Sequence, residues 1–158
     1  MASKYGYDSI VKLLINACAD IHANDNCAIR LAAEHGKLST VKLLIDSGAN
    51  IHAIRLALVY GYAQIVKLLI NSGANVHAQD NYAIRLAATY GQLQTVKLLI
   101  DAGANIHAKD NYALKKSGEN GHLKVVKLLI KHGAKIEDDI VANNYLSVRL
   151  ARIKIQSS

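Results

Sequence analysis

Apolar residues recur along the chain at the spacing of short amphipathic helices. The pattern predicts a helix at residues 93–101, in which Val96, Leu99 and Ile100 fall at positions i, i+3 and i+4 and so share one face. A second helix is predicted at residues 83–90, where the sequence Leu-Ala-Ala supplies an apolar side and small residues that allow close packing. Two short helices in succession are therefore the basic unit.

Residues suited to turns mark the ends of this helix pair. Gly91 and Gly103 follow the two helices, and glycine adopts the left-handed conformation after a helix at least cost. Asp80 or Asn81 is expected to cap the first helix, since a short side-chain oxygen can accept from free N–H groups of the first turn. Helices of about eight to ten residues are marginal alone in water, so each pair must pack against neighbouring pairs.

The helix pair is repeated along the chain. The sequence Val-Lys-Leu-Leu-Ile occurs five times, with its valine at Val11, Val41, Val66, Val96 and Val126. The intervals are 30, 25, 30 and 30 residues, so one repeat is five residues shorter than the others. A fixed period in this range is typical of solenoids, in which each repeat buries its apolar faces against its neighbours. We therefore expect an all-α stack of helical hairpins.

A longer phrase surrounds each copy. It reads Gly-x-Leu-x-x-Val-Lys-Leu-Leu-Ile-x-x-Gly-Ala-x-Ile-His-Ala, preceded by x-Leu-Ala-Ala-x-x-Gly, and it resembles the ankyrin repeat over residues 8–136. The resemblance implies an all-α, ankyrin-type helical-hairpin solenoid that binds a protein partner on its concave face without being an enzyme. The period is about three residues shorter than is usual in the family, which implies shortened or missing β-hairpin fingers. This short form, with its Asp-Asn-Tyr-Ala opening, is similar to ankyrin proteins encoded by amoeba-infecting giant viruses.

The repeats predict a single domain, residues 1–158. Its expected parts are a partial repeat at 1–23, full repeats at 24–53, 54–78, 79–108 and 109–138, and a capping helix at about 139–155. In the first repeat, Cys18 stands where the others have glycine, so a left-handed backbone there implies strain of about 1 kcal/mol. We expect this end to unfold first. The short third repeat is joined through residues 52–55, without a finger.

The composition favours a soluble chain. It is 51% hydrophobic with no Phe, Trp or Pro, and no apolar run approaches the roughly 18 residues that span a bilayer. The N-terminal sequence lacks the form of a signal peptide. A disulfide between Cys18 and Cys27 stays open, but two cysteines fit a reducing compartment better. We expect an intracellular, cytoplasmic monomer that does not bind membranes, located in the host cytoplasm if the source is viral.

The formal net charge of +7 is concentrated toward the C-terminus. Residues 115–158 hold nine Lys or Arg and four Asp or Glu, which gives this part a charge of +5. The alternative function is therefore binding of nucleic acid or an acidic partner, which would weaken steeply with salt. Its candidate residues are Lys115, Lys116, Lys124, Lys127 and Lys131. A truncated family member without a specific partner is a further alternative.

Basic side chains recur at three repeat positions. The histidines are His22, His52, His77 and His107, interpreted as forming loop hydrogen bonds between repeats. Metal binding is disfavoured because equivalent positions lie about 10 Å apart, whereas zinc needs bonds of about 2.0–2.1 Å. The lysines that follow each valine are interpreted as a solvated outer face. The third set is Arg30, Arg55, Arg85, Lys115 and Arg149, interpreted as pairing with Asp25, Asp80 or Asp110, with a binding stripe as the alternative.

No catalytic residue, cofactor site or metal site is predicted, because no nucleophile lies near a base and no glycine-rich loop follows a strand. The predicted protein-binding residues are the variable positions near the end of the first helix of each pair and on the fingers. They are Glu34, His35, Val59, Tyr60, Tyr62, Asn81, Thr89, Tyr90, Asn111, Glu119 and Asn120. Three of them are tyrosines, which give a large contact area with few rotatable bonds. Ordinary surface variation in a degenerating repeat is the alternative interpretation.

Overall fold

The computed structural model describes residues 1–49 and 55–135. Within these ranges every regular element is an α-helix and no strand occurs. The chain divides into two compact units, Met1–Asn75 and Val76–Ser158, each built from helix pairs. The prediction of one domain over the whole chain stays a prediction.

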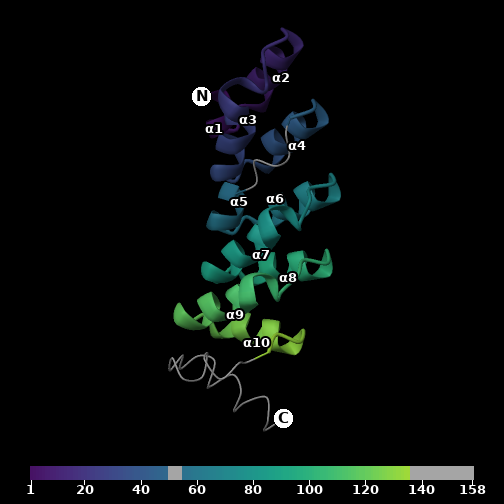
Figure 1. The fold of residues 1–158 in the computed structure, drawn as a ribbon. Coiled ribbons are helices and arrows are strands. Elements are labelled where there is room, and N and C mark those ends of the chain that lie inside the picture. The colour runs from purple at the N-terminus through teal and green to yellow at the C-terminus, as the bar shows by residue number, and fades with distance from the viewer. Residues whose placement is uncertain (50–54, 136–158) are drawn as a thin grey trace. The chain divides into compact units, whose positions relative to one another are not determined.

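Among the described residues, the first unit consists of three helix pairs. Its helices are α1 (Ala2–Tyr5), α2 (Asp8–Asn16), α3 (Ala23–Glu34), α4 (Leu38–Asp46), α5 (Arg55–Tyr60) and α6 (Ala63–Asn71). Figure 1 shows α1, α3 and α5 following one another along one side of this unit, and α2, α4 and α6 along the other. Each helix packs against its equivalent in the next pair, α1 on α3, α3 on α5, α2 on α4 and α4 on α6. The predicted stacking of equivalent helices is confirmed in this unit.

The second unit has two pairs in the part of the chain that the structure describes. Its helices are α7 (Ala78–Thr89), α8 (Leu93–Asp101), α9 (Ala108–Glu119) and α10 (Leu123–Lys131). Equivalent helices again pack on each other, α7 on α9 and α8 on α10 (Figure 1). The helix predicted at residues 93–101 is α8. The one predicted at residues 83–90 is α7, which begins earlier, at Ala78, because it includes a turn described below.

The second helix of each pair buries one face in the core. In α8, Val96 and Leu99 are 0% and 2% exposed, as the apolar spacing predicts. The third predicted residue, Ile100, is only half-buried, and Thr95 takes its place in the buried face. The buried face of α8 therefore includes Thr95 and leaves out Ile100, unlike the predicted apolar face.

The first helices contribute small residues to the same core. In α7, Ala87 and Ala88 are fully buried, as expected, and Ile84 is buried with them. Leu86, which the apolar pattern also assigned to this side, is half-buried. Alanines at the centre of the contact allow the helices of successive pairs to approach closely.

The residues that end the helices adopt the predicted backbone conformation. Gly91 and Gly103 have φ angles of 68° and 86°, in the left-handed region that favours glycine. Cys18 stands at the position equivalent to Gly103 and has a φ angle of 59°. A side chain in this region costs roughly 1–2 kcal/mol, so the structure supplies the basis for the strain expected at Cys18.

The first helix pair exposes an apolar face. Ile10 and Leu14 of α2 are 48% and 49% exposed, whereas the equivalent residues of α4, Thr40 and Leu44, are 0% and 1% exposed. A cavity of about 260 Å³ lies beside α2, with Leu14 in its lining. Few buried apolar contacts favour local opening, so early unfolding of this pair stays our prediction.

Several predicted features lie outside the described residues. These are the capping helix at about residues 139–155, most of the link at residues 52–55, His52 and Arg149. The side chain of Arg55 also lies outside them, although its backbone begins α5.

Candidate functional site

A left-handed turn begins three of the first helices. It consists of three consecutive residues with φ angles between 51° and 57°, at positions 24–26, 79–81 and 109–111. Most side chains disfavour this conformation, but asparagine and aspartate tolerate it better, and each turn contains the sequence Asp-Asn. The local sequence therefore explains why the chain can form the same unusual turn three times.

Asn81 uses its side chain to join two repeats. Its Oδ1 lies 3.1 Å from Nδ1 of His77 and accepts a 2.8 Å hydrogen bond from the backbone N–H of Asn105. Asn81 and Asn111 are only 8% and 6% exposed. The expectation that these two asparagines lie exposed on fingers is wrong, because their side chains are buried within the stack. The predicted helix cap at Asn81 is also wrong, since its oxygen is bonded elsewhere.

The recurring histidines pack beside these asparagines. The Nδ1 to Oδ1 distances are 2.9 Å for His22 and Asn26, 3.1 Å for His77 and Asn81, and 2.8 Å for His107 and Asn111. Each of these pairs lies within one turn, so loop hydrogen bonds form at this histidine position, here to the asparagine of the same turn. In the described ranges, no group of three or more His, Cys, Asp or Glu is placed to hold a metal ion.

Arg85 reaches back over the left-handed turn at the start of α7. Its Nε donates to the carbonyl oxygen of Asp80 at 3.1 Å, and its Nη2 donates to that of Gln79 at 3.0 Å. The guanidinium carbon also lies 5.5 Å and 5.3 Å from the ring centroids of Tyr82 and Tyr112, within the range of cation–π attraction. These contacts support the structural interpretation of Arg85 over a binding stripe.

Ion pairs complete the turns. The carboxylate of Asp80 lies 2.9 Å from Nζ of Lys109 in the next repeat. The hydrogen bond and charge of Lys109, together with the charge of Arg85, lower the pKa of Asp80. Arg30 pairs with Asp25 at 3.4 Å, as predicted from the sequence. The expected cap at Asp80 is wrong, because its backbone is left-handed and its carboxylate faces the neighbouring repeat's lysine.

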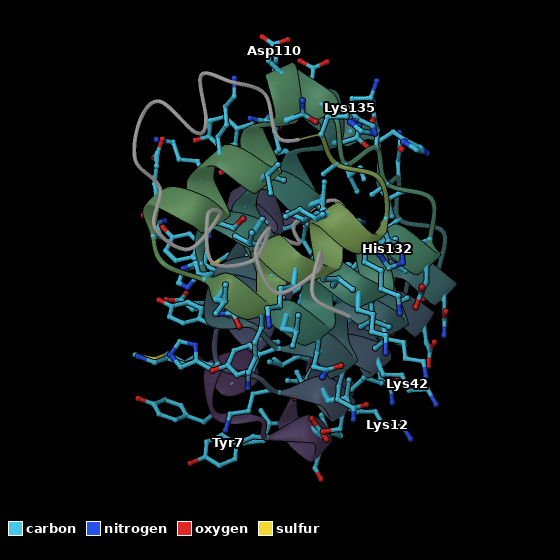
Figure 2. The ribbon with its side chains drawn as sticks, turned by 90° about the horizontal axis from the view of Figure 1, so that it is seen from below. Tyr7, Lys12, Lys42, Asp110, His132 and Lys135 are labelled. Atoms are coloured by element: carbon cyan, nitrogen blue, oxygen red, sulfur yellow. The ribbon has the colours of Figure 1, made fainter. Side chains whose placement is uncertain are left out.

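The lysines that follow each valine lie on the outside of the second helices. Lys12, Lys42, Lys67 and Lys97 are exposed and Lys127 is half-buried. Figure 2 shows Lys12 and Lys42 at one edge of the first unit and Tyr7 at another. These positions are consistent with a solvated outer face.

The candidate nucleic-acid-binding lysines are divided between two helices. Lys115 and Lys116 belong to α9 and are half-buried, whereas Lys124 and Lys131 of α10 are exposed. The Nζ of Lys116 lies 2.5 Å from a carboxylate oxygen of Glu119 and 5.9 Å from the ring centroid of Tyr112. Pairing with Glu119 reduces the positive charge that this set offers a phosphate.

The predicted binding residues at the ends of the first helices are partly accessible. Tyr60 and Tyr90 are 51% and 50% exposed. Glu119 and Asn120 are also exposed, and half-buried positions are held by Glu34, His35, Val59, Tyr62 and Thr89. Asn120 joins two repeats, because its Nδ2 donates to the carbonyl oxygen of Thr89 at 2.7 Å, and His122 lies 3.0 Å from the same oxygen.

Tyr5 and Tyr7 are exposed tyrosines that the variable positions did not predict. They are 54% and 55% exposed, and their ring centroids lie 5.9 Å apart. A sequence feature could have found them, because Tyr-Gly-Tyr occurs at residues 5–7 and again at residues 60–62. Both copies lie at the junction between the two helices of a pair.

These elements define a repeat protein of stacked helical hairpins. A family model for ankyrin repeats (3 copies) matches residues 53–140, and a single ankyrin repeat model matches residues 1–26 and 24–55. Because these matches cover most of the chain, the chain belongs to the ankyrin repeat family. The repeats of this family are modules for protein–protein interaction rather than enzymes.

The comparison with curated proteins gives no match. In the described ranges, none of the helices has the length and apolarity that a membrane span requires.

Proposed function

We propose that this ankyrin repeat chain binds another protein through the ends of its first helices, which in this family face the concave groove. In the first unit the proposed contact residues centre on Tyr60 and Tyr62, and in the second unit on Tyr90. If the source is viral, the partner is a host protein. A non-enzymatic role fits the family. It also fits the structural use of the recurring polar side chains, which hold turns and repeats together.

The observation that supports this proposal most is that an exposed tyrosine recurs at one repeat position, next to a buried helix turn. Tyr60 and Tyr90 hold equivalent positions and are half-exposed, whereas Ala57 and Ala87, three residues earlier in each helix, are fully buried. The buried turn fixes the backbone beneath each tyrosine, and a tyrosine side chain has only two χ angles to order on binding. Tyrosines held in this way are frequent among the residues that dominate binding energy.

The structure narrows the predicted contact set. Asn81 and Asn111 are removed because they are buried, and Asn120 serves partly to join two repeats. Val59 and Thr89 directly precede the tyrosines in the sequence, and Glu34 and His35 hold the equivalent positions of another repeat, so these four residues stay in the proposal. Glu119 stays as an exposed charge.

Protein capture tests the proposal. The immobilised wild-type chain, the Tyr60→Ala/Tyr90→Ala variant and a Lys42→Ala/Lys97→Ala variant would be exposed to the same host-cell lysate, and bound proteins quantified by mass spectrometry. We expect the tyrosine variant to capture at least tenfold less of the proteins that bind specifically to the wild type. The lysine variant should capture as much of them as the wild type does. Circular dichroism must show equal helicity in all three chains. Equal capture by the wild type and the tyrosine variant would overturn the proposal.

A salt titration separates this function from the nucleic-acid alternative. Binding of a labelled duplex through the lysines of α9 and α10 would fall by orders of magnitude between about 50 and 200 mM salt. Capture through tyrosines is expected to change far less over the same range.

A further inference from the structure

The two Tyr-Gly-Tyr sequences of the first unit form similar aromatic pairs. The ring centroids of Tyr5 and Tyr7 lie 5.9 Å apart with their planes tilted by 33°, and those of Tyr60 and Tyr62 lie 6.1 Å apart, tilted by 30°. Tyr5, Tyr7 and Tyr60 are more than half exposed. Each pair therefore offers two ring surfaces and two hydroxyls at the same repeat position.

Two adjacent residues of the intervening repeat, Gly36 and Lys37, lie against the two Tyr-Gly-Tyr segments. The stem of Lys37 lies over Gly6, between the first two tyrosines, since a Cβ added at Gly6 would meet Cδ of Lys37 at 3.1 Å. In the same way, the ring of Tyr62 lies over Gly36, where an added Cβ would meet Cε1 at 2.9 Å. The two pairs and Lys37 thus belong to one continuous surface of the first unit, here called the tyrosine strip: Tyr5, Tyr7, Lys37, Tyr60 and Tyr62.

The equivalent positions of the second unit have a different chemistry. They are held by Tyr90, Gln92, Asn120 and His122. His122 lies against Gly91, and both Asn120 and His122 approach the carbonyl oxygen of Thr89. Amide and imidazole groups there join repeats, whereas the tyrosine strip presents aromatic rings to solvent.

The spacing of the two pairs restricts the shape of a ligand. They are two repeats apart, which corresponds to about 20 Å at the usual spacing of packed helices. In a polyproline II helix, six residues make two full turns and advance about 19 Å, so residues six apart point the same way. A polyproline II segment could therefore place one proline ring on each tyrosine pair.

A ligand in the polyproline II conformation suits this surface better than a ligand bound as a β-strand. A strand added to a protein needs a sheet edge to pair with, and the described residues contain no strand. A polyproline II segment has a solvated backbone without internal hydrogen bonds, and aromatic rings are its usual docking surface. Residues 1–158 contain no proline, so they cannot supply such a segment themselves.

Lys37 places a positive charge between the two tyrosine pairs. Among the described residues, no carboxylate forms an ion pair with Lys37. Glu34, three residues before Lys37, is the nearest acidic residue in the sequence. Asp8, two residues after Gly6, already accepts hydrogen bonds from Ser39 and Thr40. A carboxylate midway along the ligand would therefore complement the ammonium group of Lys37.

We propose that the tyrosine strip binds a proline-rich, acidic segment in the polyproline II conformation, with prolines six residues apart and an acidic residue between them. This proposal rests on the proposed function, since it names the chemistry of a partner for the same surface in the first unit. It extends that surface to Tyr5, Tyr7 and Lys37.

Synthetic peptides test the proposal directly. The probe is a fluorescein-labelled peptide with Pro-Pro at two places six residues apart and one glutamate midway, measured by fluorescence anisotropy with the full chain. A peptide with a spacing of five residues is the matched control, because it turns the second proline by 120°. We expect the control to bind at least tenfold more weakly.

Variants locate the binding on the tyrosine strip. Tyr5→Ala/Tyr60→Ala should weaken peptide binding at least tenfold, and Tyr5→Phe/Tyr60→Phe should retain most of it because the rings remain. Lys37→Glu should weaken binding of the glutamate peptide and restore binding of a peptide with lysine at that place. Lys42→Glu, the same charge change on the outer face, should have little effect.

The outcomes separate this proposal from the proposed function. Peptides of both spacings that bind equally, or not at all, would overturn the proline-rich partner. Loss of lysate capture in Tyr60→Ala/Tyr90→Ala would in that case leave the proposed function standing. Tighter binding of a single-stranded oligothymidine, lost in Tyr5→Ala/Tyr60→Ala, would likewise overturn the proposal and point to base stacking.

Discussion

Thr40 of α4 donates a hydrogen bond from its buried Oγ1 to Oδ1 of Asp8 in α2, so one hydroxyl links the second helices of two successive repeats. Thr95 holds the equivalent position in α8 and is buried to the same degree. Its hydroxyl has no hydrogen-bond partner among the described residues. Burial of an unsatisfied polar group costs free energy that an apolar group of the same shape does not.

The two threonines should therefore respond in opposite ways to replacement by valine. Thr95→Val is expected to raise the free energy of unfolding by about 1 kcal/mol, because it removes an unpaired hydroxyl. Thr40→Val is expected to lower it by about 1 kcal/mol, because it removes a hydrogen bond to a carboxylate. Urea unfolding followed by circular dichroism measures both, and a shift of both variants in one direction would contradict this interpretation.

The contact at Asp8 also predicts a pH dependence. Hydrogen bonds from Ser39 and Thr40 hold the pKa of Asp8 below its ordinary value of 3.8. A lowered folded-state pKa contributes stability that is complete above the unfolded-state value and is lost as the pH falls through the folded-state value. Ser39→Ala should thus destabilise the chain at pH 7 but have little effect at about pH 2. An NMR titration of the Asp8 carboxyl group should show its pKa rising in the variant, and an unchanged pKa would exclude this role for Ser39.

Asn81 should be among the most sensitive polar residues of the second unit. Asn81→Ala removes the buried acceptor of the Asn105 N–H and should lower the free energy of unfolding by about 1–3 kcal/mol. Gln79→Ala is the matched control, because Gln79 has the same left-handed backbone and an exposed side chain. Thermal and urea unfolding of both variants should show a much smaller loss for Gln79→Ala. Equal losses would mean that backbone strain, rather than the buried hydrogen bond, sets the cost.

The contact between Tyr62 and Gly36 predicts a penalty for any side chain at that glycine. Gly36→Ala should cost about 1–2 kcal/mol for the left-handed backbone and about 1 kcal/mol more for the clash with the ring. Gly73→Ala is the control, since its added Cβ would meet nothing within 4 Å and only the backbone cost applies. Adding Tyr62→Ala to Gly36→Ala should remove the excess cost, which a double-mutant cycle measures.

Replacing Cys18 by glycine should stabilise the first repeat. Cys18 has a φ angle of 59°, so Cys18→Gly relieves strain of about 1 kcal/mol. Hydrogen exchange of α2 should slow in the variant, and exchange in the second unit should not change. Because α2 is exposed at Ile10 and Leu14, wild-type α2 should exchange faster than α4 and α6. Slower exchange in α2 than in α4 would contradict this order of unfolding.

The sequence predicted the helices well because the evidence for them is local. The spacing of Val96 and Leu99, and the glycines after each helix, depend on neighbouring residues alone, and both predictions are confirmed. The prediction failed at Asn81, where an Asp-Asn sequence before a helix normally indicates a cap. The left-handed turn aims Asn81 at a backbone N–H 24 residues away, a contact that local rules cannot anticipate.

The tyrosine strip likewise combines features that are visible in the sequence with contacts that only the structure shows. Both Tyr-Gly-Tyr sequences are visible in the chain, but only the packing of Lys37 on Gly6 and of Tyr62 on Gly36 shows that they belong to one surface. The sequence by itself determined the repeat, its helices and its turn glycines, because these follow from hydrophobic periodicity and backbone preferences. The tertiary structure alone decided which polar side chains hold repeats together and which stay exposed, because that depends on atoms brought together from different repeats.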